Sequence, residues 1–238
     1  MTPIFIALFF AVGFFFESIF GFGGGLIAYF FLSFFVDLKI MVIAGLYIGT
    51  LSSLYIAYGS REFFDKKLFL KIMPITVIFA IIGALVFSIG NSKFLSILLA
   101  ITLFLLALKL SFFDKYRFPK ILHLKLLILG TFIQGAFGVG GPFVVNALYD
   151  RFSSKSALRA TMAVFFVCCN ILRFIQILIT NPSTLNFIPS IFWTIIPVFI
   201  AIFLGHLIHL KIKEKYFKRG IAIITFLASI NFFAKLFY

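Results

Sequence analysis

The sequence predicts an all-helical integral membrane protein made of two related halves, and three observations carry that prediction. Hydrophobic residues make up 63% of the 238 residues and charged residues only 12%, whereas apolar residues form about half of an ordinary soluble domain. Apolar runs of about 20 residues, the length of a membrane-spanning helix, alternate with short polar segments. The glycine cluster at residues 20–26 (FGFGGGL) returns at residues 137–143 (FGVGGPF).

Four elements are expected in the first half, residues 1–116. Residues 3–36 are apolar for longer than one ordinary span, and they contain the first glycine cluster and one charge, Glu17. Such a run fits a helix that is broken inside the membrane. Ordinary spans are expected at residues 40–59, 68–90 and 94–113, with basic loops between several of the elements.

The second half, residues 117–238, repeats this order. Residues 121–149 are again overlong and hold the second glycine cluster. Spans are expected at residues 160–180, 185–210 and 220–238. Glu17 in the first half corresponds to Gln134 in the second. The shared order and spacing indicate an internal duplication whose two halves form one membrane domain.

Positive charge decides between two topologies. Of the 21 Lys and Arg residues, Arg173 lies inside a predicted span. If all eight elements cross once, the remaining cations divide equally, although cytoplasmic loops normally carry an excess of them. If both glycine-broken elements enter and leave on one face, the outer side holds only Lys39, Lys93 and Lys235. We therefore expect two inverted repeats, each opening with a re-entrant or discontinuous helix, with both termini outside and the basic loops in the cytoplasm.

Each glycine cluster is expected to place a helix N-terminus near the middle of the membrane. The first N–H groups of a helix lack partners within it, and the N-terminus carries about half a positive charge, so two such ends form a candidate anion site. Pro142 suits the first turn of a helix. The candidate binding residues are Gly21, Gly23, Gly24, Gly25, Gly138, Gly140, Gly141 and Pro142. The alternative is that these glycines only allow close helix packing.

Arg173 and Asn170 are further candidate binding residues. Arg173 follows Arg159 by fourteen residues, which is about 21 Å along a helix and deep in a hydrocarbon core about 30 Å thick. A buried arginine is costly and indicates function by default, and its planar fork suits oxyanions. Asn170 shares its helix face. The alternative for Arg173 is a permanent ion pair with Glu17.

Glu17 is the candidate for proton coupling, because carboxyl groups inside membranes serve in proton relays. The alternative is that it only caps a helix end. Five further side chains are candidates for lining the pathway, although each could equally bond the backbone or pack. They are Gln134, Thr50, Ser52, Ser53 and Cys168.

The charge and the cysteines exclude other classes of protein. The net charge of +14 follows the loops between spans, so we expect the lipid bilayer as a partner and no nucleic acid. Cys168 and Cys169 are adjacent in an apolar run, so no disulfide is expected. His206 and His209 are more typical of a helix end at the membrane interface than of a metal site. No metal or cofactor is therefore expected.

The paired motifs FGFGGGLI (residues 20–27) and QGAFGVGGPFVV (residues 134–145) resemble those of the sulfite exporter TauE/SafE family of bacterial membrane transporters. Residues 159–161 and 197–205 are also similar to that family, so the resemblance covers nearly the whole chain. It implies transport of a small sulfur-containing anion, such as sulfite, a sulfonate or a related organosulfur acid, across the bacterial cytoplasmic membrane. Glu17, opposite Gln134, departs from the usual pattern.

The expected function is therefore that of an anion permease without enzymatic activity. The rival interpretations are an intramembrane enzyme acting on a lipid-like substrate, an accessory membrane subunit, and a channel. The sequence offers no arrangement of nucleophile and base that an enzyme would use. The direction of transport, the coupling ion and the oligomeric state stay open, with a homo-oligomer among the possibilities.

Overall fold

The computed structural model describes residues 2–112, 120–208 and 214–234, and these residues are almost entirely helical. The first half begins with α1 (Thr2–Phe20) and a short α2 (Gly24–Leu32). Three long helices follow, with the 3₁₀ turn η1 (Arg61–Phe63) between the first two. These helices are α3 (Leu38–Gly59), α4 (Lys66–Ile89) and α5 (Ser92–Phe112).

The second half has the same order of short and long α-helices, but its 3₁₀ segments differ from η1 in place or length. It comprises α6 (Lys120–Phe137), α7 (Gly141–Leu148), the turn η2 (Tyr149–Arg151), α8 (Lys155–Thr180), the 3₁₀ segment η3 (Pro182–Thr194), α9 (Ile195–Ile208) and α10 (Glu214–Ala234). The span expected at residues 185–210 is thus divided into η3 and α9. Pro189 lies inside η3, and proline has no N–H for an α-helical hydrogen bond. Residues 113, 209–210 and 235–238 of the expected spans lie outside the described residues.

The helices α1 and α2 lie antiparallel as a helical hairpin. Stacking of the Phe9 ring on the Phe31 ring, with centroids 5.2 Å apart, pairs the first half of α1 with the end of α2. The chain reverses between the helices, where Gly21 and Gly23 have φ angles of 82° and 93°. Residues with a side chain rarely adopt this left-handed conformation. The glycine cluster is therefore what lets α1 end and α2 return beside it.

The helices α6 and α7 form a second hairpin with the same break. They pack so closely that a Cβ on Gly130 of α6 would lie 2.7 Å from the Cβ of Phe143 in α7. The chain reverses at Gly138, which has a φ of 76° and occupies the position that matches Gly21. Both glycine clusters therefore interrupt a helix, as the sequence predicts.

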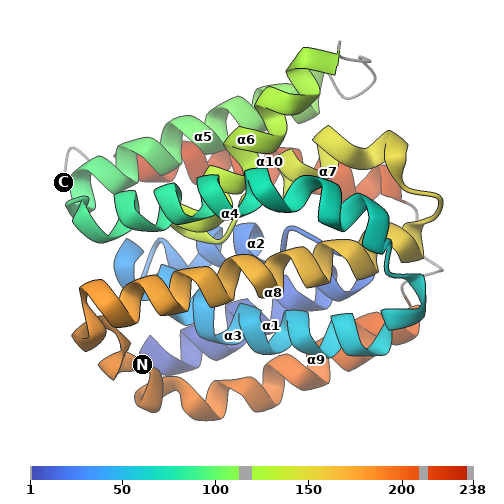
Figure 1. The fold of residues 1–238 in the computed structure, drawn as a ribbon. Helices are drawn as coiled ribbons and strands as arrows, with labels where there is room; N and C mark the ends of the chain where they lie inside the picture. The colour runs from blue at the N-terminus through green and yellow to red at the C-terminus, as the bar shows by residue number, and fades with distance from the viewer. Residues whose placement is uncertain (1, 113–119, 209–213, 235–238) are drawn as a thin grey trace.

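Helices from the two halves pack against each other in matching pairs. Helix α4 packs against α6, and α9 packs against α1, while α3 contacts α8 and α5 contacts α10. In Figure 1, α1 starts at the left-hand end and α6 starts at the upper right, so the two hairpins open toward opposite ends of the molecule. Their tips meet between α3 and α8, which is where the candidate site lies.

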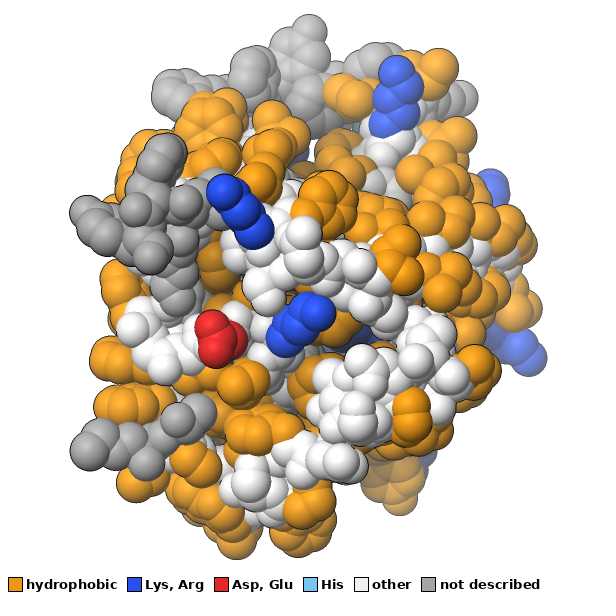
Figure 2. Space-filling view, turned by 90° about the vertical axis from the view of Figure 1, so that its left-hand side faces the viewer, with side chains coloured by type: hydrophobic (Ala, Val, Ile, Leu, Met, Phe, Trp, Pro, Cys, Tyr) orange, Lys and Arg blue, Asp and Glu red, His pale blue; other side chains and the backbone are white. Residues whose placement is uncertain are grey.

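The molecule is a multi-pass membrane protein. In the described part of the chain, six helical segments are long and apolar enough to cross a membrane, with η3 and α9 counted as one. Large apolar side chains are exposed along these segments, as contact with lipid requires. Figure 2 looks onto the left-hand end of Figure 1, where backbone atoms, other side chains and a few charged side chains lie in the middle and hydrophobic side chains border them.

Candidate functional site

A cavity lies where the tips of the two hairpins meet. Gly23 and Gly25 of the first hairpin and Gly138 and Gly141 of the second all line it. It holds about 30 Å³ of room for the centres of water-sized spheres, and one water needs roughly 10–15 Å³ on that measure. The space therefore fits a couple of waters or one small ion rather than a large organic molecule.

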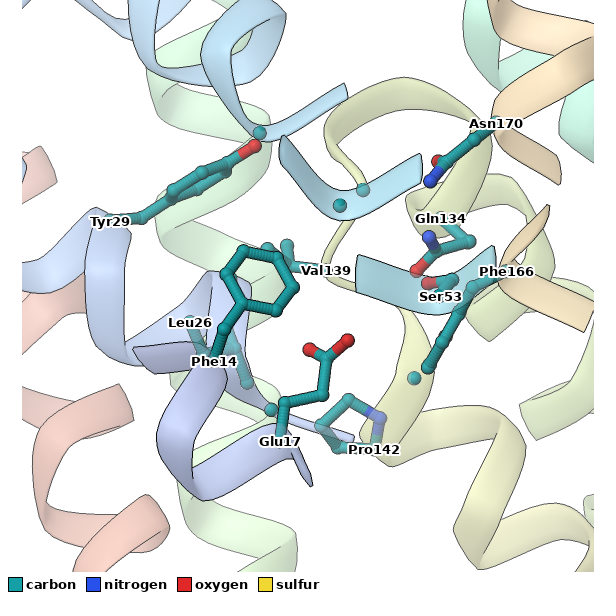
Figure 3. A pocket seen from close by; sticks show the side chains of 16 residues that line it. Phe14, Glu17, Leu26, Tyr29, Ser53, Gln134, Val139, Pro142, Phe166 and Asn170 are labelled. Carbon is teal, nitrogen blue, oxygen red and sulfur yellow. The ribbon is translucent and has the colours of Figure 1, made fainter. Parts of the chain in front are cut away.

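Glu17 reaches from α1 into this cavity and caps the N-terminus of α2. Its Oε2 accepts a hydrogen bond of 3.0 Å from the N–H of Gly24, the first residue of α2. It also interacts with the N–H of Gly25. Figure 3 shows its carboxyl group among the lining side chains, with Phe14 on one side and Phe166 on the other. A built-in acidic group thus occupies the positive end of α2.

Gln134 caps the second hairpin in the same way but with a neutral group. Its Oε1 accepts a hydrogen bond of 2.9 Å from the N–H of Gly140, directly before α7 starts at Gly141. Pro142 follows in the first turn, where its missing N–H costs little. The positive end of α7 therefore faces the cavity without a carboxyl group on it, in contrast to the end of α2.

Arg173 of α8 lies behind the tip of the second hairpin. Its side chain is 1% exposed, and its Nη2 donates a long hydrogen bond of 3.5 Å to the carbonyl oxygen of Ala136. Its Nη1 has no hydrogen-bond partner among the described residues. A Cβ on Gly138 would lie 2.8 Å from this nitrogen. Arg173 is not among the residues that line the cavity, but its unsatisfied cationic donor lies beside Gly138, which does line it.

Tyr29 of α2 ties the two hairpins together beside Arg173. Its hydroxyl donates a hydrogen bond of 2.8 Å to the carbonyl oxygen of Phe137 at the end of α6. The same hydroxyl oxygen would lie 2.5 Å from a Cβ on Gly45 of α3. Tyr29 therefore fixes the distance between the hairpin tips, and it needs a glycine on α3 to do so.

The helices α3 and α8 complete the wall of the cavity. Gly45, Gly49 and Ser53 of α3 line it, and their spacing of four residues places them on one helix face. Phe166 and Asn170 of α8 line the opposite side, and the amide nitrogen of Asn170 would lie 3.6 Å from a Cβ on Gly49. Small residues on α3 thus let the polar face of α8 come close.

The structure brings most of the predicted site residues to this place. Those that line the cavity are Glu17, Gly23, Gly25, Ser53, Gln134, Gly138, Gly141, Pro142 and Asn170. Gly24 and Gly140 donate their N–H groups to the capping side chains. Gly21 lies outside the lining, and a Cβ on it would lie 2.9 Å from the Cα of Arg159.

Three predicted pathway residues are not among the lining residues. The hydroxyl of Thr50 donates a hydrogen bond of 2.6 Å to the carbonyl oxygen of Leu46 within its own helix. Ser52 is buried, and its hydroxyl has no partner among the described residues. Cys168 is half-buried with a free thiol. Thr50 therefore agrees with the alternative to a pathway role, in which its hydroxyl group hydrogen-bonds the backbone.

Sequence reasoning missed the other lining residues. These are Phe14, Leu26, Tyr29, Gly45, Gly49, Val139 and Phe166. The apolar ones carry no signal, because any buried phenylalanine or leucine looks the same in the sequence. The pair Gly45 and Gly49 did carry one, since small residues four apart favour close helix approach in membranes.

The geometry bears on two alternatives, an ion pair between Arg173 and Glu17 and a metal site. Among the described residues, no ion pair joins Arg173 to Glu17, and each has other neighbours. In the same part of the chain, no group of three or more His, Cys, Asp or Glu side chains could hold a metal ion. The arrangement is thus a small, partly open cavity between two helix N-termini, lined by one acidic group, Glu17, and with Arg173 beside it.

A family model described as Sulfite exporter TauE/SafE matches residues 5–232 of the chain. The matched range contains both hairpins except the first three residues of α1, and it contains every residue that lines the cavity. No curated protein and no solved structure matches the chain.

Proposed function

Since the chain belongs to the sulfite exporter TauE/SafE family of membrane transporters, we propose that it is a secondary transporter for a small sulfur-containing anion. The candidate substrates are sulfite, a sulfonate or a related organosulfur acid. The cavity between the hairpins has room for only a couple of waters, which favours anions of the size of sulfite over bulkier sulfonates. The bacterial cytoplasmic membrane is the location that we propose with this function.

The observation that carries this proposal is the unpartnered Nη1 of Arg173 at the edge of the cavity. A buried cation is stable only when it is paired and hydrogen-bonded, and the described residues provide no acidic partner for it. The open end of α7 adds partial positive charge on the same hairpin. We place the anion against the second hairpin and Arg173, with Asn170 as a further polar contact.

The packing supports two inverted repeats with re-entrant hairpins. The hairpins open toward opposite ends of the molecule in Figure 1, and their tips overlap at the cavity. The exposed cations Arg61, Lys66, Lys67, Arg151 and Lys155 lie in or beside the connections from α3 to α4 and from α7 to α8. Because cytoplasmic loops carry the excess of Lys and Arg, we place this basic end in the cytoplasm and both termini outside.

Glu17 provides a route to proton coupling. While Glu17 is ionised, its carboxylate accepts hydrogen bonds at the N-terminus of α2 and repels a transported anion in the cavity. Protonation removes that charge and weakens its bonds to the N–H groups of Gly24 and Gly25, since hydrogen bonds to charged groups are the stronger ones. Anion and proton would then bind together, and their combined transfer carries no net charge for a monovalent anion.

Reconstitution of the purified chain into liposomes tests the function directly. We expect saturable uptake of radiolabelled sulfite that unlabelled sulfite and thiosulfate inhibit and acetate does not. Protein-free liposomes give the background. Absence of uptake would favour an accessory subunit or an enzyme, and uptake that does not saturate would favour a channel.

A further inference from the structure

Helix α8 carries a second buried arginine, Arg159, at the tip of the first hairpin. Its side chain is 4% exposed, although it lies only five residues into the helix. The backbone and side chain of Arg159 lie against Gly21, where a Cβ would be 2.9 Å from the Cα and 3.3 Å from the Cγ of the arginine. Two of the three left-handed glycines in the described residues, Gly21 and Gly138, are therefore each backed by an arginine of the same helix.

The polar surroundings of Arg159 satisfy only part of its guanidinium group. Its Nη2 lies 3.0 Å from Nδ1 of His206 in α9 and 3.5 Å from Oγ of Ser18 in α1. The hydroxyl of Ser18 in turn donates to the carbonyl oxygen of Ile202 at 2.7 Å. The Nε of Arg159 is buried and has no partner among the described residues. Within that part of the chain, no carboxylate pairs with it.

Arg159 lies on the same helix as two residues that line the cavity. It precedes Phe166, which lines the cavity, by two helical turns, and Arg173 follows Phe166 by two more. The two arginines thus lie on opposite sides of the cavity along one helix. The matching positions of α3 hold Val42 and Ile56, so the arginine pair is a property of α8 and not of the duplication.

We propose that Arg159, with Ser18 and His206, forms a second binding station for the transported anion between the central cavity and the basic end of the molecule. This rests on the proposed anion transport. The ligand is a small oxyanion, because a guanidinium fork with a free Nε–H matches oxyanion geometry. An anion that moves from the cavity toward the basic end would leave Arg173 and bind Arg159. It would therefore not cross the apolar interior without a cationic partner.

The competing explanation is that Arg159 only fastens α1, α8 and α9 together through Ser18 and His206. The two explanations differ in kinetics. If Arg159 only joins the helices, its variants should give less folded protein, and the protein that does fold should have an unchanged half-saturating sulfite concentration. A binding station predicts weaker saturation on one side of the membrane, because an anion arriving from the basic end meets Arg159 first.

The test compares initial rates of radiolabelled sulfite uptake in membrane vesicles of the two opposite orientations. The variants are Arg159→Gln and Arg159→Lys, with Arg151→Gln as the control. Arg151 is an exposed arginine at the same end of the molecule, so the control removes the same charge from the same side. Thermal stabilisation of each purified variant by sulfite reports on the central cavity.

We expect Arg159→Gln to raise the half-saturating sulfite concentration at least tenfold from the basic end and less than twofold from the other end. Arg159→Lys, which keeps the charge and loses the fork, should give an intermediate rise, and it carries the test if Arg159→Gln does not fold. Equal half-saturation in both Arg159 variants and the Arg151→Gln control would overturn the station alone. No saturable sulfite uptake by the unmodified protein would overturn the proposed function as well.

Discussion

At the scale of single residues, the two halves differ most at the side chains that cap the hairpins. Glu17 and Gln134 occupy matching positions and both accept a bond from the backbone at a helix start, Glu17 from the N–H of Gly24 and Gln134 from that of Gly140, one position earlier in its hairpin. One is an acid and the other an amide, although their shapes are nearly the same. The two hairpins therefore hold one capping group that can exchange a proton and one that cannot.

The substitution Glu17→Gln tests this difference. Glutamine can accept the same bond from Gly24, so we expect the fold and anion binding to persist. The part of the pH dependence of sulfite flux that Glu17 causes should disappear, because no proton would then be carried at this position, and only the part due to the titration of sulfite itself should remain. Flux is measured in liposomes across a range of pH values, with Glu62→Gln, the same change at an exposed site, as the control. Unchanged pH dependence would return Glu17 to a structural capping role.

Arg173→Gln is expected to weaken anion binding by ~1–3 kcal/mol, the range for losing a hydrogen bond to a charged group. Arg173 provides the unpartnered donor at the cavity's edge, so its loss leaves the anion without its strongest contact. Isothermal titration of the purified protein measures the affinity, and Arg151→Gln controls for the loss of one positive charge. Equal affinities in the two variants would make Arg173 a structural residue.

At the scale of the elements, the hairpin turns depend on glycine for two separate reasons. Gly138 needs a φ of 76°, and a Cβ there would also meet the guanidinium of Arg173 at 2.8 Å. We expect Gly138→Ala to destabilise the protein by roughly 1–3 kcal/mol, the cost of one strained backbone residue. Unfolding by denaturant in detergent measures this change.

Gly59→Ala is the matched control for that prediction. Gly59 ends α3, and a Cβ on it would meet no atom within 4 Å. Alanine is the better helix former by about 1 kcal/mol, so the Gly59→Ala protein should be as stable as the unmodified protein or more stable. If both alanine variants behaved alike, the turn at Gly138 would not require glycine.

The sequence could predict the hairpin breaks because the glycine cluster occurs twice at matching positions. It could not predict that η3 interrupts the span before α9, because Pro74 lies inside the continuous helix α4 while Pro189 lies in a 3₁₀ segment. Proline alone does not decide between these outcomes. The fastening of the hairpins by Tyr29 was also out of reach, since that bond joins residues 108 apart in the chain.

At the scale of the whole molecule, the two ends have unequal charge, and this predicts a fixed orientation. Ser183 in η3 and Glu62 in η1 are both exposed. Ser183 comes after the end of α8, and Glu62 comes after the end of α3. These two helices pack against each other, and the two residues lie at opposite ends of the pair. A thiol reagent that cannot cross membranes should label Ser183→Cys in intact cells and Glu62→Cys only after the membrane is opened. The unmodified chain, whose cysteines are buried or half-buried, provides the background. Labelling of both sites from outside would contradict this orientation.

Charge distribution predicted this orientation, and duplication predicted which elements match. Neither could predict which residues face each other across the cavity, because that depends on how two hairpins overlap. Arg173 was found from the cost of burying a charge, and Asn170 from its place on the same helix face. The contact between Tyr29 and Gly45 became visible only once α2 and α3 were placed together.

The central claim is that a small sulfur oxyanion binds between the two hairpin tips, and thermal unfolding of the purified protein with a panel of solutes tests it most directly. The panel holds sulfite, thiosulfate, sulfate, several sulfonates, matched carboxylates and neutral solutes. A ligand at about 100 times its dissociation constant should stabilise the folded state by about 2.7 kcal/mol. We predict stabilisation by one or two small sulfur oxyanions that Arg173→Gln reduces and Arg151→Gln preserves. Equal stability with every solute, or a response to carboxylates alone, would contradict the account.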